Sequence, residues 1–358
     1  LGSLRLMSLI NSTAIPSGVA DDYEIGHSLR FNPASSPYLS REFVTPTNRK
    51  IWTLSLWFKR GNLSGSSERR LFSTATGAGG NTDNINYTTG DSIRFIADFG
   101  QLICTQVFRD PSSWYHLIYA YDSTQGTEAN RLKLYINGTQ VTSFSTTAYP
   151  SLNQEVDFNS AVVHDIGRNL PESAQYYDGY MSEVYFIDGA AKAPADFGTT
   201  GTYGEWKPIE YSAGSYGNNG FYLNFATAND MGDDKSGNGH DFSENNIAAT
   251  DQMLDSPTNN FATLNPLWQD SSITLQEGNL RSSRNANMNR PSLSTINMGT
   301  GKWYFEALDQ YTSGNQIGVQ WEGTNVETYV HDSGTQAYTF ASSGGTYGNG
   351  SSGAGNSG

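Results

Sequence analysis

Four aspartates gather in the segment 230–241, where they alternate with glycine, serine and asparagine. Carboxylate and carbonyl oxygens are the ligands that Ca²⁺ prefers, so Asp233, Asp234 and Asp241 are candidate metal ligands. No glutamate closes the loop as an EF-hand requires. Glycine and asparagine also supply the left-handed backbone of tight turns. We therefore favour a turn that binds no cofactor and keep a Ca²⁺ site as the alternative.

A second acidic segment reads Glu155-Val156-Asp157-Phe158. A glycosidase needs two carboxylates on the same face, one as acid and one as base or nucleophile. The positions that would carry the second glutamate are Asn159 and Ser160. We therefore expect a solvated turn or edge strand here, and no enzymatic activity.

Other reactive residue types are scattered along the chain. The five histidines show none of the i, i+4 or His-x-His spacings of a zinc site. Cys104 lies in an apolar stretch and is expected to be a buried small hydrophobe. The glycines of 77–80 lack the lysine of a phosphate-binding loop, which argues against nucleotide binding.

Composition and charge narrow the class of protein. The 358 residues include 38 Gly and 21 Tyr, with 16% charged and 13% aromatic residues, as is typical of β-rich domains joined by turns. The net charge of −14 repels phosphate backbones and anionic membranes. A single cysteine allows no internal disulfide. These features predict an all-β protein that binds neither nucleic acid nor membrane.

Alternation of apolar and polar residues predicts the strands. Residues 52–58 place Trp52, Leu54, Leu56 and Phe58 on one face, with Trp57 among small polar residues on the other. Asn137-Gly138 accepts the positive φ angles of a type I′ turn, so residues 132–144 should form a hairpin. The predicted core consists of Trp52, Leu54, Leu56, Trp114, Leu117, Leu132, Leu134, Ile136, Val184 and Phe186.

Four segments resemble, in order, a known superfamily. They are the Trp-rich run 52–60, Trp114-Tyr115-His116, the run 134–138 (Leu-Tyr-Ile-Asn-Gly) and the run 178–184 (Asp-Gly-Tyr-Met-Ser-Glu-Val). This pattern resembles the laminin-G-like, concanavalin A-like superfamily. The resemblance implies an antiparallel jelly-roll sandwich.

The end of the chain resembles a different fold. Residues 299–306 (Gly-Thr-Gly-Lys-Trp-Tyr-Phe-Glu) with 317–319 (Ile-Gly-Val) look like the opening of a SPRY-like β-sandwich. We expect an N-terminal segment at 1–27, the jelly roll at 28–225, an irregular linker at 226–270 and a partial SPRY-like module at 271–358. Residues 28–41 and 255–261 are similar to proteins of marine bacteriophages, which implies a tail fibre or other virion component.

Long loops of the jelly roll are the expected binding surface, because function in such scaffolds usually resides on loops. The loops are 61–69, 76–90 and 169–177. A tyrosine there offers a sugar an apolar face and a hydroxyl, and asparagine or aspartate adds orienting hydrogen bonds. The candidate ligand-binding residues are Tyr87, Tyr176, Tyr177, Asn81, Asp83, Asn84 and Asn86.

These features together predict a non-enzymatic, extracellular virion component that forms a homo-oligomer and binds a host-surface glycan or a partner virion protein. Two alternatives stay open. One is a purely structural assembly module, in which aromatic surfaces bury against other virion proteins. The other is a glycoside hydrolase or lyase of jelly-roll fold, which would need a pair of close carboxylates that the sequence does not show.

Overall fold

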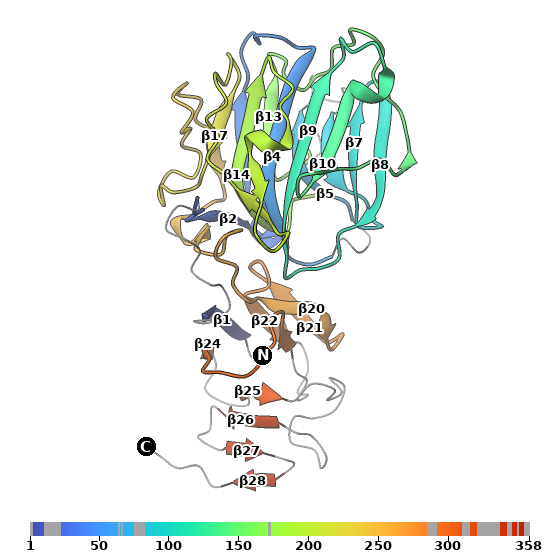
Figure 1. Ribbon diagram of the computed structural model, residues 1–358. Helices are drawn as coiled ribbons and strands as arrows, with labels where there is room; N and C mark the ends of the chain where they lie inside the picture. Colours follow the sequence, from blue (N-terminus) through green and yellow to red (C-terminus); the bar gives the residue numbers. More distant parts are fainter. Residues whose placement is uncertain are drawn as a thin grey trace. The chain divides into compact units, whose positions relative to one another are not determined.

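The structure is a computed structural model that describes residues 3–10, 23–63, 65, 67–74, 83–170, 173–284, 292–309, 316–320, 337–341, 346–348 and 351–353. The chain divides into two compact units, one formed by residues 18–260 and the other by residues 1–17 with 261–358 (Figure 1). Among the described residues, no helix has the length and apolar character of a membrane span.

The larger unit is a sandwich of two antiparallel sheets, each with eight strands over the described residues. The first sheet has the order β11-β10-β9-β4-β14-β2-β19, and β17 also pairs with β14. Its strands are β2 (Ser28–Phe31), β4 (Ile51–Arg60), β9 (Trp114–Asp122), β10 (Leu132–Ile136), β11 (Thr139–Gln140), β14 (Gly179–Asp188), β17 (Phe221–Leu223) and β19 (Gln252–Met253).

The second sheet faces it with the order β12-β8-β7-β6-β5-β13-β3-β18. Its strands are β3 (Tyr38–Glu42), β5 (Arg69–Thr74), β6 (Asn84–Tyr87), β7 (Ser92–Ala97), β8 (Gly100–Val107), β12 (Phe144–Thr146), β13 (Val163–Ile166) and β18 (Ser243–Asn245). Short 3₁₀ turns lie at Pro33–Ser35, Glu128–Asn130, Pro194–Asp196 and Ala249–Asp251.

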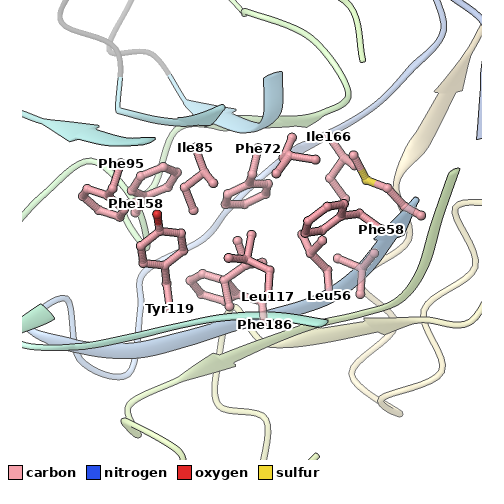
Figure 2. Packing of buried hydrophobic residues seen from close by; sticks show 14 of the residues in the cluster. Leu56, Phe58, Phe72, Ile85, Phe95, Leu117, Tyr119, Phe158, Ile166 and Phe186 are labelled. Carbon is pink, nitrogen blue, oxygen red and sulfur yellow. The ribbon is translucent and has the colours of Figure 1, made fainter. Parts of the chain in front are cut away.

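The core between the sheets is aromatic and continuous (Figure 2). Trp52 stacks on Tyr121 with ring centroids 5.1 Å apart, and Phe72 stacks on Phe158 at 5.5 Å. All ten predicted core residues are buried, which confirms the strand assignment. Nine of the ten lie in the cluster between the two sheets, whereas Trp114 packs in a separate cluster with Trp57.

The outer face of the first sheet is also covered, which the sequence did not indicate. Every residue of β14 is buried. Trp57, expected among small polar residues, stacks on His116 at 4.6 Å. The hairpin of β15 (Gly198–Thr200) and β16 (Trp206–Pro208), with the chain that follows it, covers this face.

The hairpin at Asn137-Gly138 is confirmed, with φ angles of 47° and 76° and direct pairing of β10 with β11. The strand after it is shorter than predicted. β11 ends at Gln140, and the chain then crosses to the other sheet, where β12 pairs with β8. The chain that follows this hairpin thus connects the two sheets.

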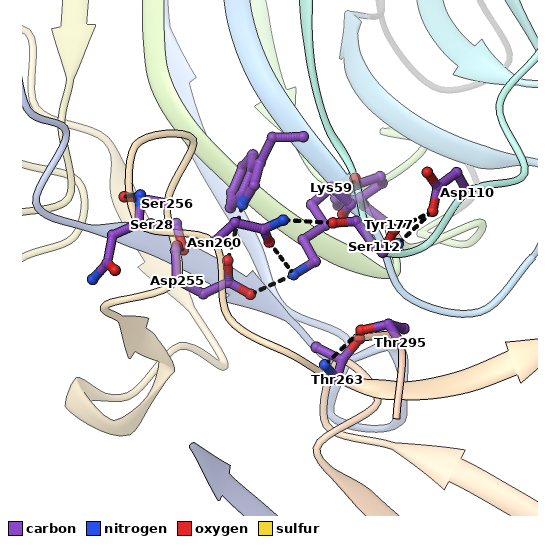
Figure 3. A network of polar contacts seen from close by, with 12 residues as sticks. Ser28, Lys59, Asp110, Ser112, Tyr177, Asp255, Ser256, Asn260, Thr263 and Thr295 are labelled. Atoms are coloured by element: carbon purple, nitrogen blue, oxygen red, sulfur yellow. Dashed lines mark hydrogen bonds and ion pairs between the residues drawn. The ribbon is translucent and has the colours of Figure 1, made fainter. Parts of the chain in front are cut away.

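The sandwich extends beyond the predicted end at residue 225, because the larger unit runs to residue 260. Within the segment expected to be an irregular linker, β18 pairs with β3 and β19 pairs with β2, so it extends both sheets. Asp255 accepts hydrogen bonds from Lys59 Nζ (2.8 Å) and Trp114 Nε1 (2.9 Å) (Figure 3). Residues 226–260 therefore belong to the jelly roll.

The smaller unit is discontinuous in sequence. β1 (Ser3–Ile10), from the predicted N-terminal segment, pairs with both β22 (Arg281–Arg284) and β24 (Tyr304–Asp309). The unit that holds residues 271–358 thus contains a strand from the other end of the chain, and the SPRY-like fold expected for those residues stays a prediction. The remaining strands are β20 (Leu264–Gln269), β21 (Ile273–Gln276), β23 (Ser292–Ser294), β25 (Gln316–Gln320), β26 (Ala337–Ala341), β27 (Thr346–Gly348) and β28 (Ser351–Gly353).

Candidate functional site

Most of the predicted ligand-binding residues are inside the protein. Tyr87 and Tyr177 are fully buried, and the Tyr177 hydroxyl donates a 2.9 Å hydrogen bond to the carbonyl of Lys59. The expected loop 76–90 contains β6, a central strand of the second sheet, which explains the burial of Tyr87. Neither tyrosine can stack on a sugar, so this prediction is wrong for both.

The polar residues predicted to bind the ligand are also mostly buried. Asn84 and Asn86 lie on β6 and are buried, as is Asp83 immediately before it. Tyr176 is half-buried and remains a prediction. Asn81 lies outside the described residues.

Asp83 has a structural role that the sequence did not suggest. Its Oδ2 accepts hydrogen bonds from the backbone N–H groups of Asp157 (2.6 Å) and Phe158 (3.2 Å). Burial raises the pKa of Asp83 to about 7, and the nearby Asp157 carboxylate adds to the shift. Its Oδ1 is buried with no hydrogen-bond partner, which favours a proton on this carboxyl as the pH falls below about 7.

The three candidate calcium ligands are engaged in a hydrogen-bonded turn. Asp234 accepts from the backbone N–H groups of Tyr222, Ser236 and His240, and from the Ser236 hydroxyl. Asp241 accepts from the N–H of Asp234, and Asp233 pairs with a lysine. Over the described residues, no group of three or more acidic, histidine or cysteine side chains could hold a metal. These hydrogen bonds make the segment a turn, and calcium binding there stays a prediction.

The same turn forms one wall of an open pocket of about 810 Å³, a size within the usual range for small-ligand sites. The pocket lies at the end of the sandwich where β14 ends and β17 begins. Four chain segments supply its lining, which consists of Val44, Thr47, Asp188, Gly189, Ala190, Lys192, Ala213, Ser215, Gly217, Asn218, Asn238 and His240.

The Asp188 carboxylate accepts hydrogen bonds from several loops that line or adjoin the pocket. Asp188 is the last residue of β14 and is 3% exposed. Its Oδ2 accepts from the N–H groups of Thr47 (2.6 Å) and Asn219 (3.1 Å). Its Oδ1 accepts from the N–H of Asn48 (3.1 Å) and from Asn159 Nδ2 (2.7 Å). One carboxylate thus fixes three loops, and both its oxygens are occupied.

Glycine shapes the part of the lining that packs against Asp188. A Cβ at Gly217, which has a φ of 76°, would lie 2.1 Å from the Asp188 carbonyl oxygen, so only glycine fits. Asn238 Nδ2 donates to the carbonyls of Gly217 and Gly220, both at 2.9 Å. His240 Nδ1 lies 2.9 Å from the Gly220 carbonyl, which can only accept, so Nδ1 carries the proton.

These internal bonds determine which groups remain available to a ligand. Thr47 Oγ1 and Ser215 Oγ each accept a backbone N–H, which leaves their hydroxyl protons to donate. Asn238 uses its amide protons internally and retains an acceptor oxygen. The second ring nitrogen of His240, Nε2, is an acceptor when the ring carries its single proton on Nδ1. The pocket therefore combines donors and acceptors, as a polyhydroxylated ligand requires.

In a serine–histidine pair of the first sheet, the histidine donates the hydrogen bond to the serine, which is the reverse of what catalysis requires. Ser55 Oγ lies 2.8 Å from His116 Nε2, the geometry of a nucleophile and its base. Trp206 Nε1 donates to His116 Nδ1 at 2.9 Å, so the proton of the neutral ring is on Nε2. His116 therefore donates to the serine and cannot accept its proton. Burial also lowers the pKa of His116 to about 3.

Two other carboxylates outside the pocket, Glu155 and Glu183, have structural partners. Glu155 pairs with Arg49 at 3.0 Å on the surface. Glu183, at a bulge in β14, accepts hydrogen bonds from the hydroxyls of Tyr23, Tyr185 and Tyr222. It is 3% exposed, and burial raises its pKa. Among the described residues that line the pocket, Asp188 is the sole carboxylate.

Residues 34–194 match the family described as the concanavalin A-like lectin/glucanases superfamily. The sandwich is a concanavalin A-like, laminin-G-like jelly roll. The match lies within residues 18–260 and ends just beyond Lys192 of the pocket. A comparison with curated proteins gave no match.

Three solved structures are similar to this jelly roll. A Bacteroides ovatus protein to which carbohydrate binding has been ascribed is 16% identical, with a TM-score of 0.45; the alignment covers 66% of this chain and 62% of that one. A heptameric SAP-like pentraxin of Limulus polyphemus is 14% identical (TM-score 0.32; 53% and 77% covered). Domains LG4-5 of the mouse laminin alpha1 chain are 11% identical (TM-score 0.32; 57% and 50% covered). With identities of 16% or less and TM-scores below 0.5, these likenesses carry no argument about this chain.

Proposed function

We propose that the jelly roll is a non-enzymatic carbohydrate-binding module and that the pocket beside Asp188 is its binding site. The observation that carries this proposal is the mixed set of donors and acceptors left on the pocket wall. A sugar hydroxyl both donates and accepts, so it pairs with both kinds of group. The match of residues 34–194 to a family of lectins and glucanases supports the same ligand class.

Binding without hydrolysis is the form of this proposal that the geometry supports. Glycoside hydrolysis requires two carboxylates about 5 to 10 Å apart that can exchange protons with the substrate. The carboxylate in the pocket, Asp188, is buried and accepts four hydrogen bonds. Ser55 is not activated as a nucleophile, because His116 donates a hydrogen bond to it and does not accept its proton.

The experiment is a glycan array followed by titration calorimetry of each saccharide that binds. Ala213→Trp should fill the pocket from an exposed position, so we expect it to abolish binding without lowering the melting temperature. Ala129→Trp, at another exposed site, is the matched control. Full binding by Ala213→Trp would show that the ligand sits elsewhere. Release of reducing sugar by the wild type would contradict the non-enzymatic part.

We further propose that this module acts on the outside of a bacteriophage virion, as part of a tail fibre or decoration protein that forms a homo-oligomer. The resemblance of residues 28–41 and 255–261 to marine bacteriophage proteins supports this setting. Light scattering of the full chain should give a mass several times that of one chain. Gold-labelled antibody should locate the chain on virion tails; a monomer absent from particles would contradict this setting.

A further inference from the structure

Lys192 is the cation on the pocket wall. It follows β14 by a few residues and is half-buried. Its Nζ donates to the carbonyl of Ala213 at 2.6 Å and lies 5.6 Å from the centre of the Tyr211 ring. No described carboxylate lies within ion-pair distance of this Nζ. An ammonium group has three protons to donate, so at least one is left for a ligand.

The carboxylate of Asp188, in the same pocket, is not accessible to a ligand as the Lys192 ammonium is. Asp188 is 3% exposed, and four donors surround its oxygens. A ligand entering the pocket therefore meets an available ammonium but no available carboxylate. The hydroxyls of Thr47 and Ser215 are further donors on the lining.

We propose that the pocket selects saccharides that carry a carboxylate, and that Lys192 determines this specificity. This inference rests on the proposed function and names its ligand class: acidic sugars such as uronic or sialic acids. A hydrogen bond between charged groups is worth more than one between neutral groups. The overall charge of −14 repels anions at long range, so the selection comes from this short-range contact.

Matched pairs of ligands test the selection. We would titrate glucose and glucuronic acid, galactose and galacturonic acid, and the methyl ester of sialyllactose and sialyllactose itself, because the members of each pair differ only in the carboxylate. The wild type should bind the acidic member of at least one pair about ten-fold or more tightly. Lys192→Met should remove this preference but retain binding of the neutral member, and Lys192→Arg should preserve it.

Lys133→Met is the control, because it removes one positive charge from β10, away from the pocket lining. It should leave the preference unchanged. If loss of preference also followed Lys133→Met, net charge and not the Lys192 contact would be responsible. Equal affinity of the wild type for both members of every pair would overturn charge selection while leaving saccharide binding intact. Failure of every saccharide to bind would overturn the proposed function itself.

Discussion

Asp188→Asn tests the idea that one carboxylate builds the pocket. Each Asp188 oxygen accepts two hydrogen bonds, from Thr47 N and Asn219 N on one side and from Asn48 N and Asn159 Nδ2 on the other. An asparagine has one acceptor oxygen, so in either orientation its amide faces two donors. Each buried unsatisfied donor costs about 1–3 kcal/mol, so the variant should lose roughly 2–6 kcal/mol of unfolding free energy.

Urea unfolding of the full chain, followed by tryptophan fluorescence, measures this cost. The control is Asp196→Asn, because Asp196 accepts a hydrogen bond from the exposed backbone N–H of Ala193 in a 3₁₀ turn. It should change stability by less than about 1 kcal/mol. Asp188→Asn should also lose saccharide binding. Equal stability of the two variants, within about 0.5 kcal/mol, would refute the assignment of Asp188 as the organiser of three loops.

Three other predictions follow from the described core. Leu134→Ala should cost about 2–5 kcal/mol in urea unfolding, because Leu134 is 1% exposed; a cost below about 0.5 kcal/mol would contradict the strand facing. Tyr177→Ala should lower the melting temperature strongly, whereas Tyr176→Ala should lower it little; similar shifts would contradict the burial of Tyr177. Folding raises the pKa of Asp83 from 3.8 to about 7, so its protonation stabilises the fold fully below pH 4, and this contribution is lost as pH rises through 7. Asp83→Asn should therefore gain stability relative to the wild type between pH 4 and pH 8, by a difference on the order of 4 kcal/mol at most; a constant difference would contradict it.

The sandwich was predictable because its signals are local. Alternation along residues 52–58 and the Asn137-Gly138 turn determine a strand face and a hairpin from neighbouring residues alone. Burial on the outer face was not predictable, because the chain around Trp206 that covers Trp57 and His116 is remote in sequence. The pairing of β1 with β22 and β24 is non-local for the same reason.

The pocket could not be predicted because its walls come from distant segments. Thr47, Asp188, Ser215 and His240 meet only in the folded chain. The sequence contains one usable signal, the glycine- and asparagine-rich segments 217–220 and 236–239, which mark two tight turns. Nothing in either segment indicates that Asn238 contacts Gly217. The loop tyrosines failed as candidates because Tyr87 alternates with asparagines in a strand whose two faces are both covered.

A crystal structure of the full chain with the tightest-binding saccharide from the array tests the central claim most directly. The account predicts sugar density in the pocket beside Asp188, with hydrogen bonds to Lys192, Ser215 and His240 and an intact glycosidic bond. Density at another surface of the jelly roll, with this pocket unoccupied at saturating ligand, would contradict it.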